Sequence, residues 1–204
     1  MTGPRMRFAP HIDARWIADL ALAVTLSASF GWQEYMQRND LDQRLIEPFA
    51  GVSALAPCHQ TPEPRRFWFA DDGDLSLVIE AVDVERGELI TADFVSWPIT
   101  CPSAVSTAFG RVDLLGADQV DNPASFYGGR PLFVHRTPLS WLRAGCSGVV
   151  VLDERRAGAR LAGALGNLLA EDLDHARELH RIMGRAFPTS RIRVPASSIH
   201  RGAA

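Results

Sequence analysis

The sequence predicts an α/β protein, α+β overall, with N-terminal helices, a three-stranded antiparallel meander and a C-terminal unit of alternating strands and helices around a short parallel sheet. Three observations predict it. Apolar residues recur at helical spacing near the N-terminus, apolar and polar residues alternate after Arg66, and short β-branched runs alternate with helical segments after Pro131. The 204 residues are 47% hydrophobic and 22% charged, which suffices for one compact globular domain.

The first predicted unit, residues 1–56, is helical. Apolar residues at positions 12–24 follow helical spacing and Asp13 can cap the start, so we expect a helix over residues 13–36. A second helix is expected over residues 41–49. Three prolines then predict a linker over residues 56–65.

The N-terminal helix also has the outline of an export signal, because arginines precede the apolar run 16–30. Asp19 interrupts that run, and Thr25 and Ser27 dilute it, so we favour a buried or partner-facing helix. The three cysteines are odd in number and far apart, which argues against a secreted disulfide scaffold. We therefore expect a cytoplasmic protein.

The second predicted unit, residues 66–116, is the meander. Its strands are expected at residues 67–70, 75–82 and 89–95, joined by short acidic turns that contain glycine. A short helix over residues 103–115, stopped by Gly116, is expected to close the unit. A loop over residues 121–130 follows.

The third predicted unit, residues 131–195, consists of strands that alternate with helices. Strands are expected at residues 132–135, 148–152, 167–170 and 191–194, and helices at residues 138–144, 155–164 and 174–183. This order predicts a parallel sheet with right-handed crossovers.

Acidic side chains follow the strands of that sheet, where the carboxyl ends of parallel strands bring their loops together. Asp153, Asp172 and Asp174 are the candidate ligands of a magnesium ion, since carboxylate oxygens suit Mg²⁺. The alternative is that each carboxylate caps a helix N-terminus and binds no metal. Without magnesium, no cofactor is expected.

Two arginines are candidate anion-binding residues. Arg130 follows two glycines whose backbone can embrace an anion, although an ordinary turn has the same sequence. Arg136 lies at the end of the first predicted parallel strand. Beside it, Cys146 and His135 would form a nucleophile–base pair if the fold brought them together.

The order of elements and the Asp172-Leu173-Asp174 motif resemble the Toprim domain of primases and topoisomerases over about residues 131–195. The resemblance implies that Asp172 and Asp174 stand at that family's metal-binding Asp-x-Asp. The family's catalytic glutamate follows the first strand, where this chain has His135, Arg136 and Thr137. The resemblance therefore implies a degenerate, non-catalytic copy. Residues 93–116 and 136–145 also resemble uncharacterised proteins of bacterial prophages.

The composition excludes several classes of enzyme, and three hypotheses about function remain. All 21 basic residues are arginines, so Schiff-base lysines and the Walker A lysine are excluded. The leading hypothesis is a non-catalytic binding protein of phage or prophage type, with a protein or nucleic-acid partner and no membrane association. One alternative is a magnesium-dependent nuclease or phosphoryl-transfer enzyme. The other is a homo-oligomer assembled through the N-terminal helix, with Trp16, Trp32 and Tyr35 as anchors.

Overall fold

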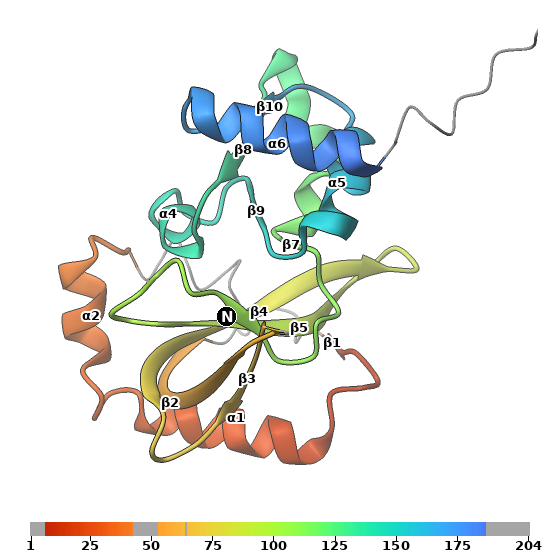
Figure 1. Ribbon diagram of the computed structural model, residues 1–204. Coiled ribbons are helices and arrows are strands. Elements are labelled where there is room, and N and C mark those ends of the chain that lie inside the picture. The colour runs from red at the N-terminus through yellow and green to blue at the C-terminus, as the bar shows by residue number, and fades with distance from the viewer. Residues whose placement is uncertain (1–6, 43–52, 64, 187–204) are drawn as a thin grey trace, which may run out of the picture.

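The chain builds two β-sheets, the first from residues 7–107 and the second from residues 114–169 (Figure 1). The computed structural model describes residues 7–42, 53–63 and 65–186. In Figure 1 helix α1 lies under the first sheet, and helix α6 lies at the opposite end of the molecule, over the second sheet. The predicted combination of helices with antiparallel and parallel strands is confirmed.

The N-terminal helix is shorter than predicted. Helix α1, Ala14–Leu26, begins at Asp13, whose carboxylate accepts a hydrogen bond from Trp16 N at 2.8 Å. It ends where the Ser27 hydroxyl donates to Ala23 O and accepts from Leu55 N. Side-chain hydrogen bonds of this kind compete with helix continuation. A separate helix α2, Trp32–Arg38, follows, so the single helix over residues 13–36 is wrong. The predicted helix over residues 41–49 lies almost wholly outside the described residues.

The first sheet closes on itself. Its order is β1-β5-β4-β2-β3-β6, and β6 also pairs with β5, so five of its strands form a ring. The strands are β1 Arg7–Phe8, β2 Ser53–Pro62, β3 Arg65–Phe69, β4 Asp74–Glu85, β5 Glu88–Pro98 and β6 Ser106–Thr107.

The expected linker and the expected meander order are both wrong. Strand β2 occupies most of the predicted linker over residues 56–65 and lies between β3 and β4. Pro57 lacks an N–H but still accepts a hydrogen bond from Ala70 N, so the proline does not break the strand. The β4–β5 hairpin is antiparallel as predicted.

The predicted helix over residues 103–115 is also wrong. Two short strands replace it, β6 and β7 Leu114–Leu115. The chain between them is tied to Asp93, a fully buried residue of β5. The Asp93 carboxylate accepts hydrogen bonds from Phe94 N at 2.7 Å, Phe109 N at 2.9 Å and Arg111 N at 2.6 Å. The Phe109 and Arg111 amides thus bond a side chain of β5, which local sequence does not reveal.

The second sheet has the predicted parallel strands. Strand β8, Leu132–His135, lies between β9, Val149–Val151, and β10, Leu168–Leu169, and pairs in parallel with both, while β7 adds antiparallel to β9. The helices are α4 Pro138–Arg143, α5 Glu154–Ala162 and α6 Leu173–Ala186. Two 3₁₀ segments, Ala117–Gln119 and Pro123–Gly129, lie between β7 and β8 in the sequence. The expected strand over residues 191–194 lies outside the described residues.

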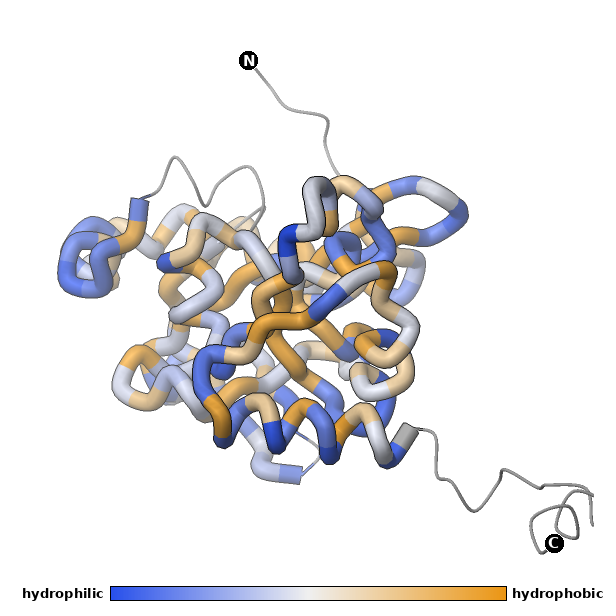
Figure 2. Tube along the Cα trace, turned by 90° about the horizontal axis from the view of Figure 1, so that it is seen from above, coloured by the Kyte–Doolittle hydropathy of each residue, from blue (hydrophilic) through white to orange (hydrophobic). Residues whose placement is uncertain are grey.

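The two sheets share an apolar layer. One hydrophobic cluster combines Leu77 and Trp97 of the first sheet with Trp141, Cys146 and Val150 of the second half. Figure 2 shows hydrophobic stretches through the middle of the molecule and hydrophilic ones at its outer turns. Burial of this layer is non-directional, so it holds the halves together without fixing their mutual orientation.

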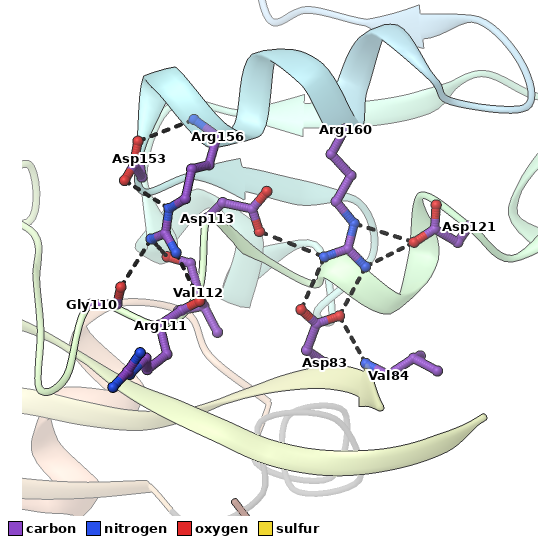
Figure 3. Close-up of polar contacts among 10 residues, drawn as sticks. All are labelled: Asp83, Val84, Gly110, Arg111, Val112, Asp113, Asp121, Asp153, Arg156 and Arg160. Carbon is purple, nitrogen blue, oxygen red and sulfur yellow. Dashed lines mark hydrogen bonds and ion pairs between the residues drawn. The ribbon is translucent and has the colours of Figure 1, made fainter. Parts of the chain in front are cut away.

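Arg160 of α5 supplies the directional contact between the sheets (Figure 3). Its guanidinium donates to both carboxylate oxygens of Asp83 in β4, at 2.8 and 3.0 Å. It also donates to Asp121 and lies 3.5 Å from Asp113. Burial opposes its charge, but the three carboxylates outweigh that effect and raise the pKa of Arg160 above its usual range. We call these four residues the Arg160 network.

Arg156, one turn earlier on α5, holds the chain that leads into β7 (Figure 3). Its Nε donates to Asp153 at 2.9 Å. Its two Nη atoms donate to the carbonyl oxygens of Gly110, Arg111 and Val112, each at 3.0 Å. The loop of residues 110–112 is therefore fixed to the start of α5.

Gly148, the residue before β9, provides a test of this packing. Its φ is +91°, and a Cβ there would overlap the Phe133 carbonyl oxygen in β8. Gly87 in the β4–β5 turn has a similar φ of +83° but open space around it. We expect Gly87→Ala to cost about 1 kcal/mol of unfolding free energy from backbone strain alone.

We expect Gly148→Ala to cost about 3 kcal/mol, because the clash with β8 adds to the same strain. Urea denaturation measures both values. Equal costs for the two variants would show that β8 and β9 are not packed this closely.

Candidate functional site

A cavity of about 440 Å³ lies at the carboxyl ends of β8 and β9. His135, Arg136 and Thr137 line it from the end of β8, and α6 contributes His175 and Glu178. The remaining lining residues are Arg65, Ser103, Val151, Leu152, Glu154, Leu179 and Ile182. This is the edge at which parallel α/β sheets bind ligands. We call it the His135 cavity.

A second cavity of about 240 Å³ adjoins the first. It is lined by Arg66 and Thr107 of the first sheet, Gly110 of the loop, and Arg156 of α5, among others. Both cavities include Arg65 and Leu152 in their walls. We call the smaller one the Arg66 cavity, and the two together the inter-sheet cleft.

His135 is buried and its tautomer follows from its hydrogen bond. Its Nε2 lies 2.8 Å from Ser147 O, a carbonyl that can only accept, so Nε2 carries the proton. Nδ1 lies 3.9 Å from Glu171 Oε1. Burial lowers the pKa of His135, although the Ser147 carbonyl and Glu171 act in the opposite direction. The ring is therefore neutral at pH 7.

His175 is buried on α6 and is neutral for related reasons. Its Nδ1 accepts a hydrogen bond from Glu171 N at 3.2 Å, which leaves the proton on Nε2. Burial lowers the pKa of His175, and the positive charge of Arg136 lowers it further. The cleft thus holds two uncharged imidazoles with assigned tautomers.

Arg136 is surrounded by carboxylates. Its guanidinium lies 2.7 Å from Asp172, 3.6 Å from Glu178 and 3.7 Å from Glu171. Its backbone N also donates to Glu171 Oε1 at 3.0 Å. The hydrogen bond to Asp172 raises the pKa of Arg136. Because its charge is already matched, Arg136 does not offer the free cation that the predicted anion site needs.

Arg130, the other predicted anion-binding residue, follows the segment Pro123–Gly129 and is exposed. It lines neither cavity of the inter-sheet cleft. The structure therefore does not bring the two predicted anion-binding arginines together. Arg136 is ion-paired inside the cleft, and Arg130 lies outside it.

The three predicted metal ligands are engaged separately. Asp153 caps α5, accepting from the backbone N of Arg155 and Arg156. Asp172 accepts from His175 N at 2.8 Å and so caps α6. Asp174 lies in the first turn of α6 and pairs with Arg177 at 2.9 Å. Helix capping is confirmed for Asp153 and Asp172, whereas Asp174 lies inside the first turn of α6 and does not cap it.

These carboxylates do not meet at one point. Glu154, next to Asp153, pairs with Arg181 on the second half of α6. Asp174 lies about 10 Å back along that helix, at roughly 1.5 Å per residue. Within residues 7–42, 53–63 and 65–186, no group of three His, Cys, Asp or Glu side chains is arranged to hold a metal ion.

Cys146 does not have the environment of a nucleophile. It is buried, and burial raises the pKa of its thiol to about 12. The Nε2 proton of His135 is directed to Ser147 O rather than to sulfur. The proposed Cys146–His135 pair is therefore not set up to form a thiolate.

Sequence reasoning missed Arg65 and Arg66, which line the cleft from the start of β3. The only indication in the sequence was two consecutive arginines after a proline. Because residues 56–65 were predicted to be a linker, these arginines were not considered as part of a site. Their position depends on the pairing of β3 with β2 and β6, which brings together residues far apart in the chain.

Comparison with known proteins finds no matching family model, curated protein or solved structure. The likeness to the Toprim domain therefore stays a prediction. In the described part of the chain, no helix is both long enough and apolar enough to cross a membrane.

The buried histidines predict a pH dependence. An unfolded histidine has a pKa of about 6.5, and folding lowers that of His135, so the unfolded state binds more protons just below this value. The contribution of neutral His135 to the free energy of unfolding is therefore complete above about pH 6.5. It is lost as the pH falls below this value toward the lowered pKa of the folded state. We expect wild type to lose stability faster than His135→Gln between pH of about 7 and 5, by at most about 1.4 kcal/mol per pH unit.

Urea denaturation across this pH range measures the difference, with His180→Gln on the exposed surface of α6 as the control. The control should follow wild type. Parallel curves for wild type and His135→Gln would contradict the assigned environment of His135.

Proposed function

We propose that this protein is a non-catalytic binding protein and that the inter-sheet cleft is its binding site. The observation that carries the proposal is the placement of Arg136 among Asp172, Glu171 and Glu178. These groups stand where an enzyme would need a free acid, base or metal ligand, yet all three carboxylates are ion-paired with Arg136. What remains is a shaped cavity with polar and apolar walls, which suits recognition.

The proposed setting is a phage or prophage protein that works beside nucleic-acid metabolism. The resemblance to the Toprim domain supports this, because the missing glutamate and the retained Asp172 and Asp174 fit a copy that has lost catalysis. A cytoplasmic location is part of the proposal. It is supported by the three cysteines, Cys58, Cys101 and Cys146, all of which are free thiols.

The test against the magnesium-dependent alternative uses Asp172→Asn. Asparagine caps a helix about as well as aspartate, so the variant keeps the start of α6 and removes only the charge beside Arg136. We expect calorimetric titration with millimolar Mg²⁺ to give the same small heats for wild type and variant. We also expect neither protein to cleave nucleic acid.

Asp74→Asn is the control, since Asp74 is an exposed aspartate at the start of β4 that lines neither cavity. Magnesium-dependent cleavage that Asp172→Asn abolishes would show that the protein is an enzyme.

Self-association through α1 is a second candidate, on a surface different from the one predicted. Trp16 packs against a group of phenylalanine rings and Tyr35 is in the core, so neither is available as an interface anchor. Trp32 packs partly buried on the same core. However, Leu22, Val24 and Leu26 on α1 are 58%, 41% and 41% exposed. Leu22 and Leu26 are four residues apart and so lie on one face of the helix, and exposed apolar side chains that share a face favour an interface.

Light scattering tests this candidate. If α1 is the interface, wild type shows a dimer mass at micromolar concentration, and Leu22→Glu combined with Leu26→Glu gives a monomer. Leu173→Glu, at a leucine that is 67% exposed at the start of α6, should leave the mass unchanged. A monomeric wild type at all concentrations would exclude self-association through α1.

A further inference from the structure

The Arg66 cavity carries positive charge that the described side chains do not balance. Three arginines line it, Arg65, Arg66 and Arg156, together with one acid, Asp153. That carboxylate already accepts from Arg156 and from two backbone amides of α5. The guanidinium of Arg65 forms no hydrogen bond or ion pair with any described residue, so its donors are available to a ligand.

Arg66 is held in place by its surroundings. Its Nη1 donates to Thr107 Oγ1 at 3.2 Å and to Arg65 O at 2.9 Å. Its guanidinium lies against Gly110, where any Cβ would overlap it. The Gly110 carbonyl is bonded to Arg156, so the surface under Arg66 is itself fixed. Two consecutive arginines of β3 therefore line the cavity. The guanidinium of Arg66 is held in place, and that of Arg65 has no partner among the described residues.

We propose that the inter-sheet cleft binds a small phosphate monoester, with its phosphate in the Arg66 cavity between Arg65 and Arg66. The planar fork of an arginine matches two oxygens of a phosphate, and a dianion matches two guanidinium charges. The His135 cavity receives the rest of the molecule. Its volume of about 440 Å³ and its mixed walls, with Leu179 and Ile182 opposite the strand ends, suit a body of nucleoside size. This inference names the ligand of the binding function proposed above and rests on it.

The cleft fits one phosphate rather than the repeated phosphates of a polynucleotide. Apart from Arg65, the arginine that lines the His135 cavity is Arg136, and three carboxylates already match its charge. Glu154 and Glu178 also line that cavity. A second phosphate would find no free cation among these lining residues.

Isothermal titration calorimetry tests the assignment with adenosine 5′-monophosphate, adenosine and inorganic phosphate as probes. We expect the monophosphate to bind, inorganic phosphate to compete with it, and adenosine alone to bind at least tenfold more weakly. Arg65→Ala and Arg66→Ala should each weaken monophosphate binding about tenfold, because each removes charge-assisted hydrogen bonds.

Arg155→Ala is the matched control. Arg155 is an exposed arginine of α5 that lines neither cavity, so this variant removes the same charge beside the lining residue Arg156 without altering the cleft. It should bind like wild type. Arg65→Ala is the decisive variant because the Arg65 side chain forms no hydrogen bond or ion pair with a described residue, and thermal unfolding checks that its fold is unchanged.

Three results would overturn the inference. They are no monophosphate binding by wild type, equal weakening by Arg155→Ala, and tighter binding of a thymidine oligonucleotide that also depends on Arg65. Phosphorus NMR separates this inference from the proposed function. Turnover of the bound monophosphate would refute the non-catalytic role and leave the site standing. Absence of both binding and turnover would refute the site and leave the non-catalytic role standing.

Discussion

The architecture depends on one guanidinium, that of Arg160. It carries the directional contact between the sheets because it donates from α5 to Asp83 on β4, which belongs to the first sheet. Its side chain is only 19% exposed, so Asp83, Asp113 and Asp121 rely on it for their counter-charge. Asp83 and Asp113, whose side chains are 26% and 14% exposed, would lose stability without that charge, whereas Asp121 is 62% exposed and depends on it less. The apolar layer holds the two sheets together, and the Arg160 network fixes their orientation relative to each other.

The cleft is a consequence of this orientation. With α5 fixed on the first sheet, Arg156 reaches the carbonyls of residues 110–112 and holds the loop against which Arg66 lies. The same placement brings Arg65 of β3 opposite the strand ends that carry His135 and Arg136. Two surfaces from distant parts of the chain thereby form adjoining cavities. Their charges differ, because Arg136 is paired within its own half and Arg65 has no described partner.

What the sequence predicted correctly was encoded locally. The parallel strands β8, β9 and β10, the helices α4, α5 and α6, and the β4–β5 hairpin each show their own periodicity and end signals. Asp153 and Asp172 could be interpreted as caps because each directly precedes a helix. The prediction that Asp174 caps a helix was wrong because α6 starts before it, at Leu173.

The errors involve contacts between residues far apart in the sequence. Strand β2 contains prolines and was predicted as a linker, yet its pairing with β4 and β3 makes it central to the first sheet. The backbone after β6 has helical-looking residues, but Asp93 binds its amides instead. The cleft arginines could not be identified as a site because only the pairing of β3 brings them beside the second sheet. A pattern along one segment holds no information about such partners.

A double-mutant cycle between Arg160 and Asp83 tests the central claim most directly. Arg160→Met, Asp83→Asn and the double variant are compared with wild type by the free energy of unfolding. The account predicts a coupling energy between about 1 and 3 kcal/mol, since each single change strands the other partner. Costs that add to within about 0.5 kcal/mol would show that Arg160 and Asp83 act independently, and that Arg160 does not join the two sheets.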